Sequence, residues 1–155
     1  MGMFDALQIS ASALTAERLR MDVTAENLAN AQSTRGANGG PYRRKEVILS
    51  EAASGQDFGS RLSVAMGSRA AGGAAGGGTP GGVEVAAITE DARPPRMVHD
   101  PGHPDANADG YVAMPNVDSV TEMVDLISSS RAYEANVTAM QASKQMFAKT
   151  MELLR

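Results

Sequence analysis

The sequence predicts a mainly α protein in which long N- and C-terminal helices pair as a coiled coil beside a small β-rich middle module. Apolar residues recur every three or four positions at both ends, whereas Gly and Pro gather between them. Aromatic residues make up only 4% of the chain, so the core is expected to be aliphatic and thin. We expect an N-terminal helical segment at 1–35, an extended middle at 36–115 and a C-terminal helical segment at 116–155.

The N-terminal helix is expected from about Asp5 to Ala31, where two apolar stripes run along it. Arg18 and Asp22 have the spacing of an ion pair on one helix face. The first stripe keeps a coiled-coil period over Phe4, Leu7, Ala11, Leu14, Arg18, Met21, Ala25 and Leu28. The second stripe comprises Ile9, Ala13, Ala16, Leu19 and Val23. An antiparallel helix pair would cover only the first stripe, so the second predicts contacts with further chains.

The middle of the chain combines turn residues, short strands and a Gly/Ala-rich segment. Residues 38–41 (Asn-Gly-Gly-Pro) predict a turn, and residues 42–49 and 83–88 predict strands. The segment 67–82 is almost entirely Gly and Ala, which predicts a mobile loop because it cannot bury enough apolar area to order itself. Four prolines between residues 94 and 104 exclude a helix there.

The C-terminal helix is expected from Ser119 to Arg155, without an internal Gly or Pro. Ser119 and Glu122 have the spacing of a capping box. Its apolar stripe comprises Met123, Leu126, Ser130, Tyr133, Val137, Met140, Lys144, Phe147, Met151 and Leu154. At about 1.5 Å per residue, such a helix is longer than a domain of this size needs to cover its own core, so it predicts a partner helix.

Composition excludes several classes of function. A net charge of −4 argues against nucleic acid as the main partner, since phosphate binding needs clustered Lys and Arg. The chain has no Cys, which excludes disulfides, thiolate metal sites and Cys nucleophiles. It has no run of about 18 apolar residues to span a bilayer and no apolar signal-peptide core near its start. We therefore expect no membrane insertion and, if the protein leaves the cytoplasm, export without a cleaved signal.

Three motifs could suggest chemistry, and each fails on its context. The G-x-G-x-x-G at residues 76–81 is interrupted by Thr-Pro where a phosphate-binding loop should open a helix. His99 and His103 cannot share a helix face because Pro and Gly intervene. Residues 105–110 match only the first half of a calcium loop, and Asn116 stands where the closing Glu belongs. We expect no enzyme activity, no metal and no cofactor.

Both ends of the chain resemble the bacterial flagellar axial family. Residues 24–31 (Thr-Ala-Glu-Asn-Leu-Ala-Asn-Ala) are similar to its Asn-rich box. Residues 116–118, 122–123 (Glu-Met) and 131–136 (Arg-Ala-Tyr-Glu-Ala-Asn) are similar to its second box. Residues 39–45, 82–91 and 100–112 are similar to the basal-body rod protein C subfamily, which forms the proximal rod. The resemblance implies a structural subunit that is exported unfolded through the type III apparatus. It also implies helical polymerisation in the periplasm into a tube that serves as drive shaft and export channel.

The resemblance implies partners and an assembly interface. The partners would be copies of the chain, other proximal and distal rod subunits, the rod-base protein, the export apparatus and surrounding ring proteins. The assembly interface would comprise Leu7, Leu14, Met21, Asn27, Leu28, Asn30, Met123, Leu126, Arg131, Tyr133, Glu134, Asn136, Met140, Phe147 and Leu154. Arg131 and Glu134 could equally form a pair within one helix. Contacts of the middle module would involve Tyr42, Arg43, Arg44, His103, Asp105 and Tyr111.

Two rival functions remain open at this point. The helical termini alone would suit a cytoplasmic coiled-coil adaptor or chaperone, which predicts stable self-association of the purified chain. A metal-dependent enzyme using His99, His103 and nearby carboxylates predicts a stoichiometric metal.

Overall fold

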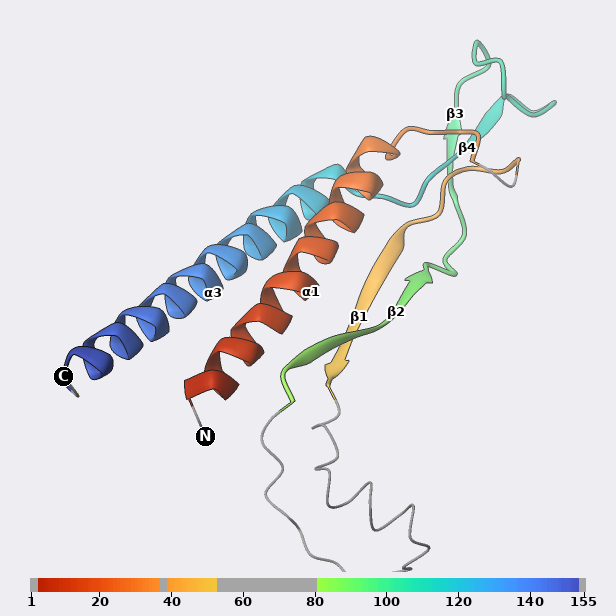
Figure 1. Ribbon diagram of the computed structural model, residues 1–155. Helices are drawn as coiled ribbons and strands as arrows, with labels where there is room; N and C mark the ends of the chain where they lie inside the picture. Colours follow the sequence, from red (N-terminus) through yellow and green to blue (C-terminus); the bar gives the residue numbers. More distant parts are fainter. Residues whose placement is uncertain (1–2, 37–38, 53–80, 154–155) are drawn as a thin grey trace, which may run out of the picture.

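The computed structural model describes residues 3–36, 39–52 and 81–153. Most of the predicted mobile loop at 67–82 lies outside the described residues. The elements follow the order α1 (Met3–Ala29), β1 (Lys45–Glu51), β2 (Val83–Glu90), β3 (Arg96–His99), β4 (Tyr111–Met114) and α3 (Ser119–Leu153) (Figure 1). The predicted fold class, with two long terminal helices packed together and a small antiparallel β middle, is confirmed.

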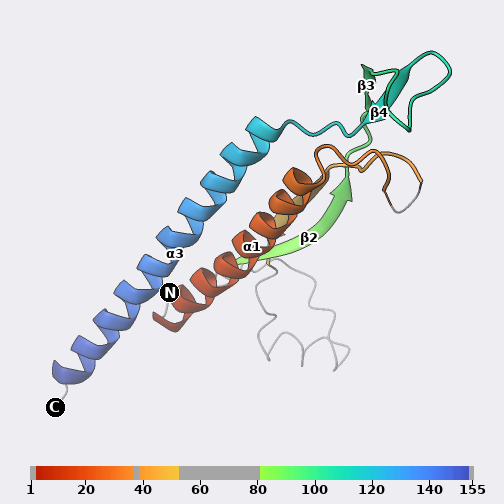
Figure 2. The same ribbon diagram turned by 90° about the horizontal axis from the view of Figure 1, so that it is seen from above.

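The helices α1 and α3 lie side by side in opposite directions, so the two chain ends lie at the same end of the pair (Figures 1 and 2). Both helices run without interruption because neither contains Gly or Pro. After Ala29 the backbone tightens, since the Ala31 amide bonds the Leu28 carbonyl three residues back. Helix α1 therefore ends two residues before the predicted boundary.

The N-terminal cap of α3 is Asp118, so the predicted capping box of Ser119 and Glu122 is wrong. One Asp118 carboxylate oxygen accepts the Val120 amide at 3.1 Å, and the other accepts the Thr121 hydroxyl at 2.8 Å. These bonds lower the pKa of Asp118, the side-chain bond from Thr121 most. Glu122 cannot reach back to the cap because its carboxylate is bound elsewhere, as described below.

Strands β1 and β2 form an antiparallel hairpin that runs along α1 (Figure 1). The pairing aligns Val47 with Ile88 and contains a bulge after Ile48. The Ser12 hydroxyl of α1 accepts the Val83 amide at 3.1 Å, which ties the hairpin to the helix. Gly82 has φ +84°, and a Cβ there would collide with the Ser12 hydroxyl, so only Gly allows this close approach.

The hairpin covers the second apolar stripe of α1, so the inference that this stripe needs further chains is wrong. Ala16 and Val23 are only 3% and 6% exposed within the single chain. Val23 of α1 and Val47 of β1 line the same small hollow, and the Ile9 backbone lies beside Gly82. The periodicity of α1 revealed a face that must be buried, but it could not reveal that strands of the same chain bury it.

Strands β3 and β4 form a second antiparallel sheet, in which His99 pairs with Tyr111. The proline-rich sequence predicted an extended backbone here but not these two strands. The loop between them is fixed to the segment after α1, because Asp105 accepts the Thr34 hydroxyl at 2.8 Å and the Arg35 Nε at 2.7 Å. The described part of the middle region therefore forms two separate small sheets, each held to the helical part by different contacts.

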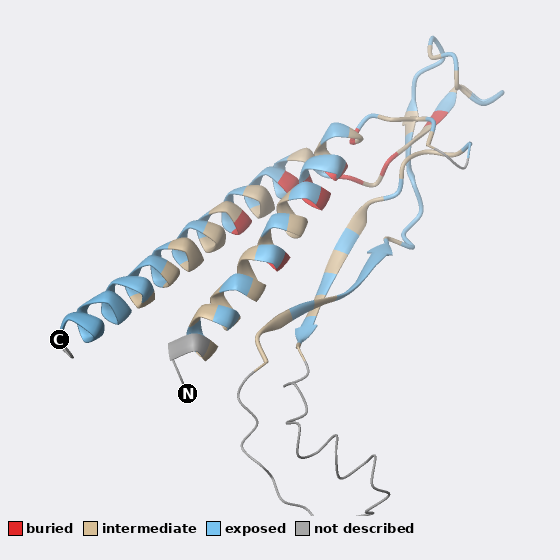
Figure 3. Cartoon of the chain, in the orientation of Figure 1, coloured by how far each residue is buried: buried red, intermediate tan, exposed pale blue. Residues whose placement is uncertain are grey.

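The buried part of the molecule is small (Figure 3). Among the described residues, the buried apolar side chains are Ala16, Val23, Ala31, Val112, Pro115 and Val117. The buried polar side chains are Thr24, Asn27, Glu122 and Ser129. Polar groups thus make up a large share of this core, and they require internal hydrogen-bond partners.

Candidate assembly site

A buried polar junction joins the end of α1, the start of β1 and the start of α3. Its centre is Asn27, which is 1% exposed. The Asn27 amide nitrogen donates to the Lys45 carbonyl at 2.8 Å and to Glu122 Oε2 at 3.1 Å. Its oxygen accepts the Lys45 amide and the Tyr42 hydroxyl, both at 2.9 Å. One side chain therefore satisfies groups from all three elements.

The charge of Glu122, also 1% exposed, is compensated by Arg44. Arg44 Nε donates to Glu122 Oε1 at 2.6 Å, and an Nη of Arg44 lies 3.6 Å from Asp125. Burial alone would lower the pKa of Arg44, but its hydrogen bond and proximity to Glu122 raise it overall. The Arg44 guanidinium thus stays charged, and the Glu122 carboxylate is paired despite its burial.

Tyr42 and Lys45 complete the junction at its solvent side. Burial, followed by the nearby Glu26 charge, raises the pKa of Tyr42, so the phenol is neutral and can donate to Asn27. Lys45 Nζ donates to Glu26 at 2.6 Å, and this bond raises the pKa of Lys45. A slip of α3 by one turn would separate Glu122 from both of its partners, so the junction fixes the helix register.

The side of α3 that faces α1 is displaced from the predicted stripe. Leu126, Tyr133 and Met140 are half-buried there, but Met123 is 49% exposed. The most buried positions are Glu122 and Ser129, which a search for apolar residues cannot find. The remaining predicted α3 residues are distributed as follows: half-buried Asn136, exposed Arg131, Glu134 and Phe147, and Leu154 outside the described residues.

The predicted residues of α1 lie at the edge of its buried face. They are Leu7, Leu14, Met21 and Leu28, all of them half-buried. Asn30 bonds its own helix, since its amide nitrogen donates to the Glu26 carbonyl at 2.9 Å. Of the α1 residues predicted from the Asn-rich box, only Asn27 enters the junction. Its amide can both donate and accept, which is the signal in the sequence that could have indicated this position.

Ser129 offers a test of how tightly the helices pack. Its hydroxyl is buried and has no hydrogen-bond partner within the described residues. Because an unpaired buried hydroxyl costs roughly 1–3 kcal/mol, we expect Ser129→Ala to leave the free energy of unfolding unchanged or to raise it by up to about 1 kcal/mol. Thermal and urea unfolding of the purified chain would measure this, with the exposed neighbour substitution Ser128→Ala as control. A loss above about 1 kcal/mol for Ser129→Ala would contradict the absence of a partner.

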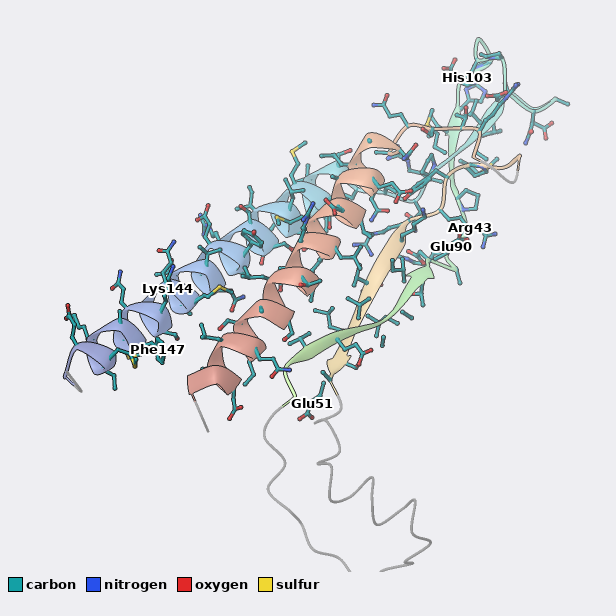
Figure 4. All side chains as sticks on the ribbon, in the orientation of Figure 1. Arg43, Glu51, Glu90, His103, Lys144 and Phe147 are labelled. Carbon is teal, nitrogen blue, oxygen red and sulfur yellow. The ribbon has the colours of Figure 1, made fainter. Side chains whose placement is uncertain are left out.

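The middle-module residues predicted to contact other subunits separate into two groups. Tyr42 and Arg44 point into the junction, whereas Arg43 is exposed and lies near Glu90 at the end of the hairpin (Figure 4). Arg43 lines an open hollow of about 800 Å³ beside the segment after α1. Tyr111 is 43% exposed and meets the His99 ring edge-on at 5.0 Å. Only the exposed members of this set are available to another chain.

The anchor at Asp105 predicts a pH dependence. The Arg35 and Thr34 hydrogen bonds lower the pKa of Asp105 below its ordinary value near 3.9. The stabilisation is therefore complete above about pH 4 and is lost as the pH falls through the lowered folded-state value. We expect the Asp105 carboxyl, followed by NMR, to titrate below the ordinary value, and Arg35→Ala to raise its midpoint. An unchanged midpoint in that variant would show that Arg35 does not hold the carboxylate.

The residues of the rival metal site have other contacts. His103 Nδ1 accepts the Asp105 amide at 3.1 Å, and Asp105 itself is bound to Thr34 and Arg35. Within residues 3–36, 39–52 and 81–153, no three His, Asp or Glu side chains are placed to hold a metal ion together. In the same ranges, neither helix combines the length and hydropathy that a bilayer span requires.

Comparison with known proteins identifies the family. The chain is 52% identical to the flagellar basal-body rod protein FlgC of Bacillus subtilis, over 97% of both chains. It is 40% identical to the same protein of Salmonella typhimurium over 99% of this chain and 98% of that one. The chain belongs to the FlgC family of flagellar basal-body rod proteins. The FlgC of Borreliella burgdorferi, 38% identical over 100% of this chain and 99% of that one, extends the similarity to a more distant relative.

Two family models match separate parts of the chain. The flagella basal body rod protein model matches residues 7–37, and the flagellar basal body rod FlgEFG C-terminal model matches residues 108–153. Both helices lie largely within these matches, as do Asn27 and Glu122 of the polar junction, whereas its residues Tyr42, Arg44 and Lys45 lie between the two matches. FlgC-family membership makes this chain a structural subunit of the flagellar rod, assembled with other rod subunits. It thereby favours the rod over the cytoplasmic adaptor and the metal-dependent enzyme.

Proposed function

We propose that this chain polymerises helically through α1 and α3 in the proximal part of the rod. There it would contact copies of itself and the neighbouring proximal and distal subunits. The assembled tube transmits torque as a drive shaft and encloses the channel for type III export. Its wall consists of the terminal helices, while the two small sheets lie outside it.

The observation that carries this proposal is the apolar surface left exposed on α3. Val120, Val124 and Ile127 are 68%, 60% and 52% exposed, and they recur at spacings of four and three on one helix face. Met146, Phe147 and Met151 are exposed at the other end of the helix, where Figure 4 labels Phe147. Two exposed apolar clusters of this kind are typical of a subunit whose burial is completed by its neighbours.

The proposed mechanics follow from the shape of the subunit. Two long helices give each copy a lateral surface along most of its length, so shear is distributed over many parallel contacts. A contact between different surfaces of successive copies produces an open helical filament, as a shaft requires. The polar junction keeps α1, α3 and the hairpin in one register, so that a load on one element is passed to the others.

Export and localisation fit the same proposal. The chain has no Cys, so unfolding for passage through the type III apparatus requires no disulfide reduction. Its described core contains few large side chains. Assembly follows in the periplasmic space, where the rod-base protein and surrounding ring proteins are further partners of the growing rod. No cofactor, nucleic acid or membrane insertion is needed for this role.

The test is the composition of detergent-extracted basal bodies. Mass spectrometry of these particles should find this chain at a fixed ratio to the other rod subunits. A deletion strain should lack rods and hooks and should not swim, and expression of the chain should restore both. Absence of the chain from particles, together with abundance in the cytoplasm, would overturn the proposed function.

A further inference from the structure

Two outward faces of the helix pair carry charges that have no ion-pair partner within the described residues. The predicted pairs Arg18–Asp22 and Arg131–Glu134 do not form, and all four side chains are exposed. None of them takes part in an ion pair within the described residues, whereas Arg35, Arg44, Lys45 and Arg93 each do. The unpaired charges lie on α1 and α3, away from the hairpin and the polar junction.

These charges lie on two helix faces whose side chains differ in size. The outward face of α1 follows the helix repeat and consists mostly of small residues: Ala11, Thr15, Arg18, Asp22, Ala25 and Ala29, all exposed. The outward face of α3 begins with bulky apolar residues and continues with the charges: Val120, Val124, Ile127, Arg131, Glu134 and Thr138, all exposed. A row of large side chains on one helix can pack against small residues on another.

The order of residues on the two faces is complementary when the helices run in opposite directions. If Ile127 lies over Ala25, the next step along α3 brings Arg131 to Asp22, and the step after that brings Glu134 to Arg18. A parallel arrangement can match only one of these ion pairs at a time. The antiparallel arrangement therefore forms the apolar contact and both ion pairs at the same time.

We infer that the α3 face of one copy docks antiparallel on the α1 face of a second copy, with Asp22–Arg131 and Arg18–Glu134 as intermolecular ion pairs. The inference rests on the proposed function and specifies its lateral contact. Because the two faces differ, each copy keeps one free face after docking, so the contact continues from copy to copy. The ion pairs select the register, while Val124 and Ile127 supply the apolar burial.

Disulfide trapping in assembled rods tests this contact, since the chain has no Cys of its own. Two single-cysteine variants, Ala25→Cys and Ile127→Cys, would be expressed together in the deletion strain. A disulfide requires the Cα atoms to approach within about 7 Å, so oxidised basal bodies should yield a crosslinked dimer of this chain. Neither variant alone should yield it, and Ala25→Cys with the adjacent Ser128→Cys should yield several-fold less.

Charge exchange provides a second readout that does not depend on cysteine. Asp22→Arg should reduce the swimming-halo diameter at least twofold, and adding Arg131→Asp should restore most of it. Adding Lys144→Asp, which makes the same charge change elsewhere on α3, should not. Absence of both the dimer and the rescue, in particles that contain the chain, overturns the inference and leaves the proposed function standing. Absence of the unsubstituted chain from particles overturns the proposed function instead.

Discussion

Replacing Glu122 by Ala is expected to lower the free energy of unfolding by about 3 kcal/mol. The substitution leaves Asn27 without one acceptor and Arg44 without its nearest counter-ion inside a buried junction. The loss lies at the lower end of values for broken buried pairs, because Arg44 is 19% exposed and keeps Asp125 within 3.6 Å. Urea unfolding of the purified chain measures it. In cells, a loss of this size should abolish rod assembly and swimming.

Glu122→Gln separates the effect of the Glu122 charge from that of its size, and Gln141→Ala serves as the control. Glu122→Gln keeps an acceptor for Asn27 but loses the ion pair with Arg44, so a smaller loss of about 1–2 kcal/mol is expected. The exposed Gln141→Ala on the same helix should change stability by less than about 0.5 kcal/mol. If Glu122→Ala were as mild as Gln141→Ala, the junction would not be fixing the helix register.

Leu126→Asp and Tyr133→Ala are expected to abolish motility while the secreted subunit remains detectable. Both side chains are half-buried on the α3 face toward α1. An unpaired carboxylate at Leu126 must stay hydrated, so it separates the helices at that point. Removing the Tyr133 ring deletes a large contact, at a cost of about 2 kcal/mol for this half-buried position. Swimming assays with immunodetection of the exported chain measure both effects.

The matched control for Leu126→Asp is Ser128→Asp, which introduces the same charge on the same helix at an exposed position. It should leave the stability of the purified chain within about 0.5 kcal/mol of the parent. Normal swimming by both Leu126→Asp and Tyr133→Ala would show that the contact between the helices does not depend on these residues. Loss of the chain from the secreted fraction would instead indicate a failure of export.

The hydrophobic repeat predicted both helices well, because a long run without Gly or Pro and with regular apolar spacing has few alternative structures. It predicted the packed face of α3 less well. The most buried α3 positions include Glu122 and Ser129, and a pattern based on apolar residues passes over polar ones. Lys144 and Phe147, which the pattern placed in the stripe, are both exposed near the C-terminal end of α3 (Figure 4).

The predicted capping box failed for a related reason. Glu122 has the right spacing from Ser119 for a local bond, but Arg44 and Asn27 bind its carboxylate from distant parts of the chain. A sequence pattern considers only neighbours along the chain, whereas a buried carboxylate is held by whichever charge the fold brings to it. The intrahelical pairs expected for Arg18 and Arg131 are absent in the same way, because exposed local pairs contribute little.

The sequence by itself determined the two terminal helices, the β character of the middle and, through its resemblance to the rod family, the class of function. These follow from local propensity and from motifs that lie close together along the chain. Only the tertiary structure decided that the hairpin covers the second stripe of α1 and that Asn27, Arg44 and Glu122 meet. Those contacts join residues up to 95 positions apart, and the free energy that selects them comes from burying polar groups with their partners.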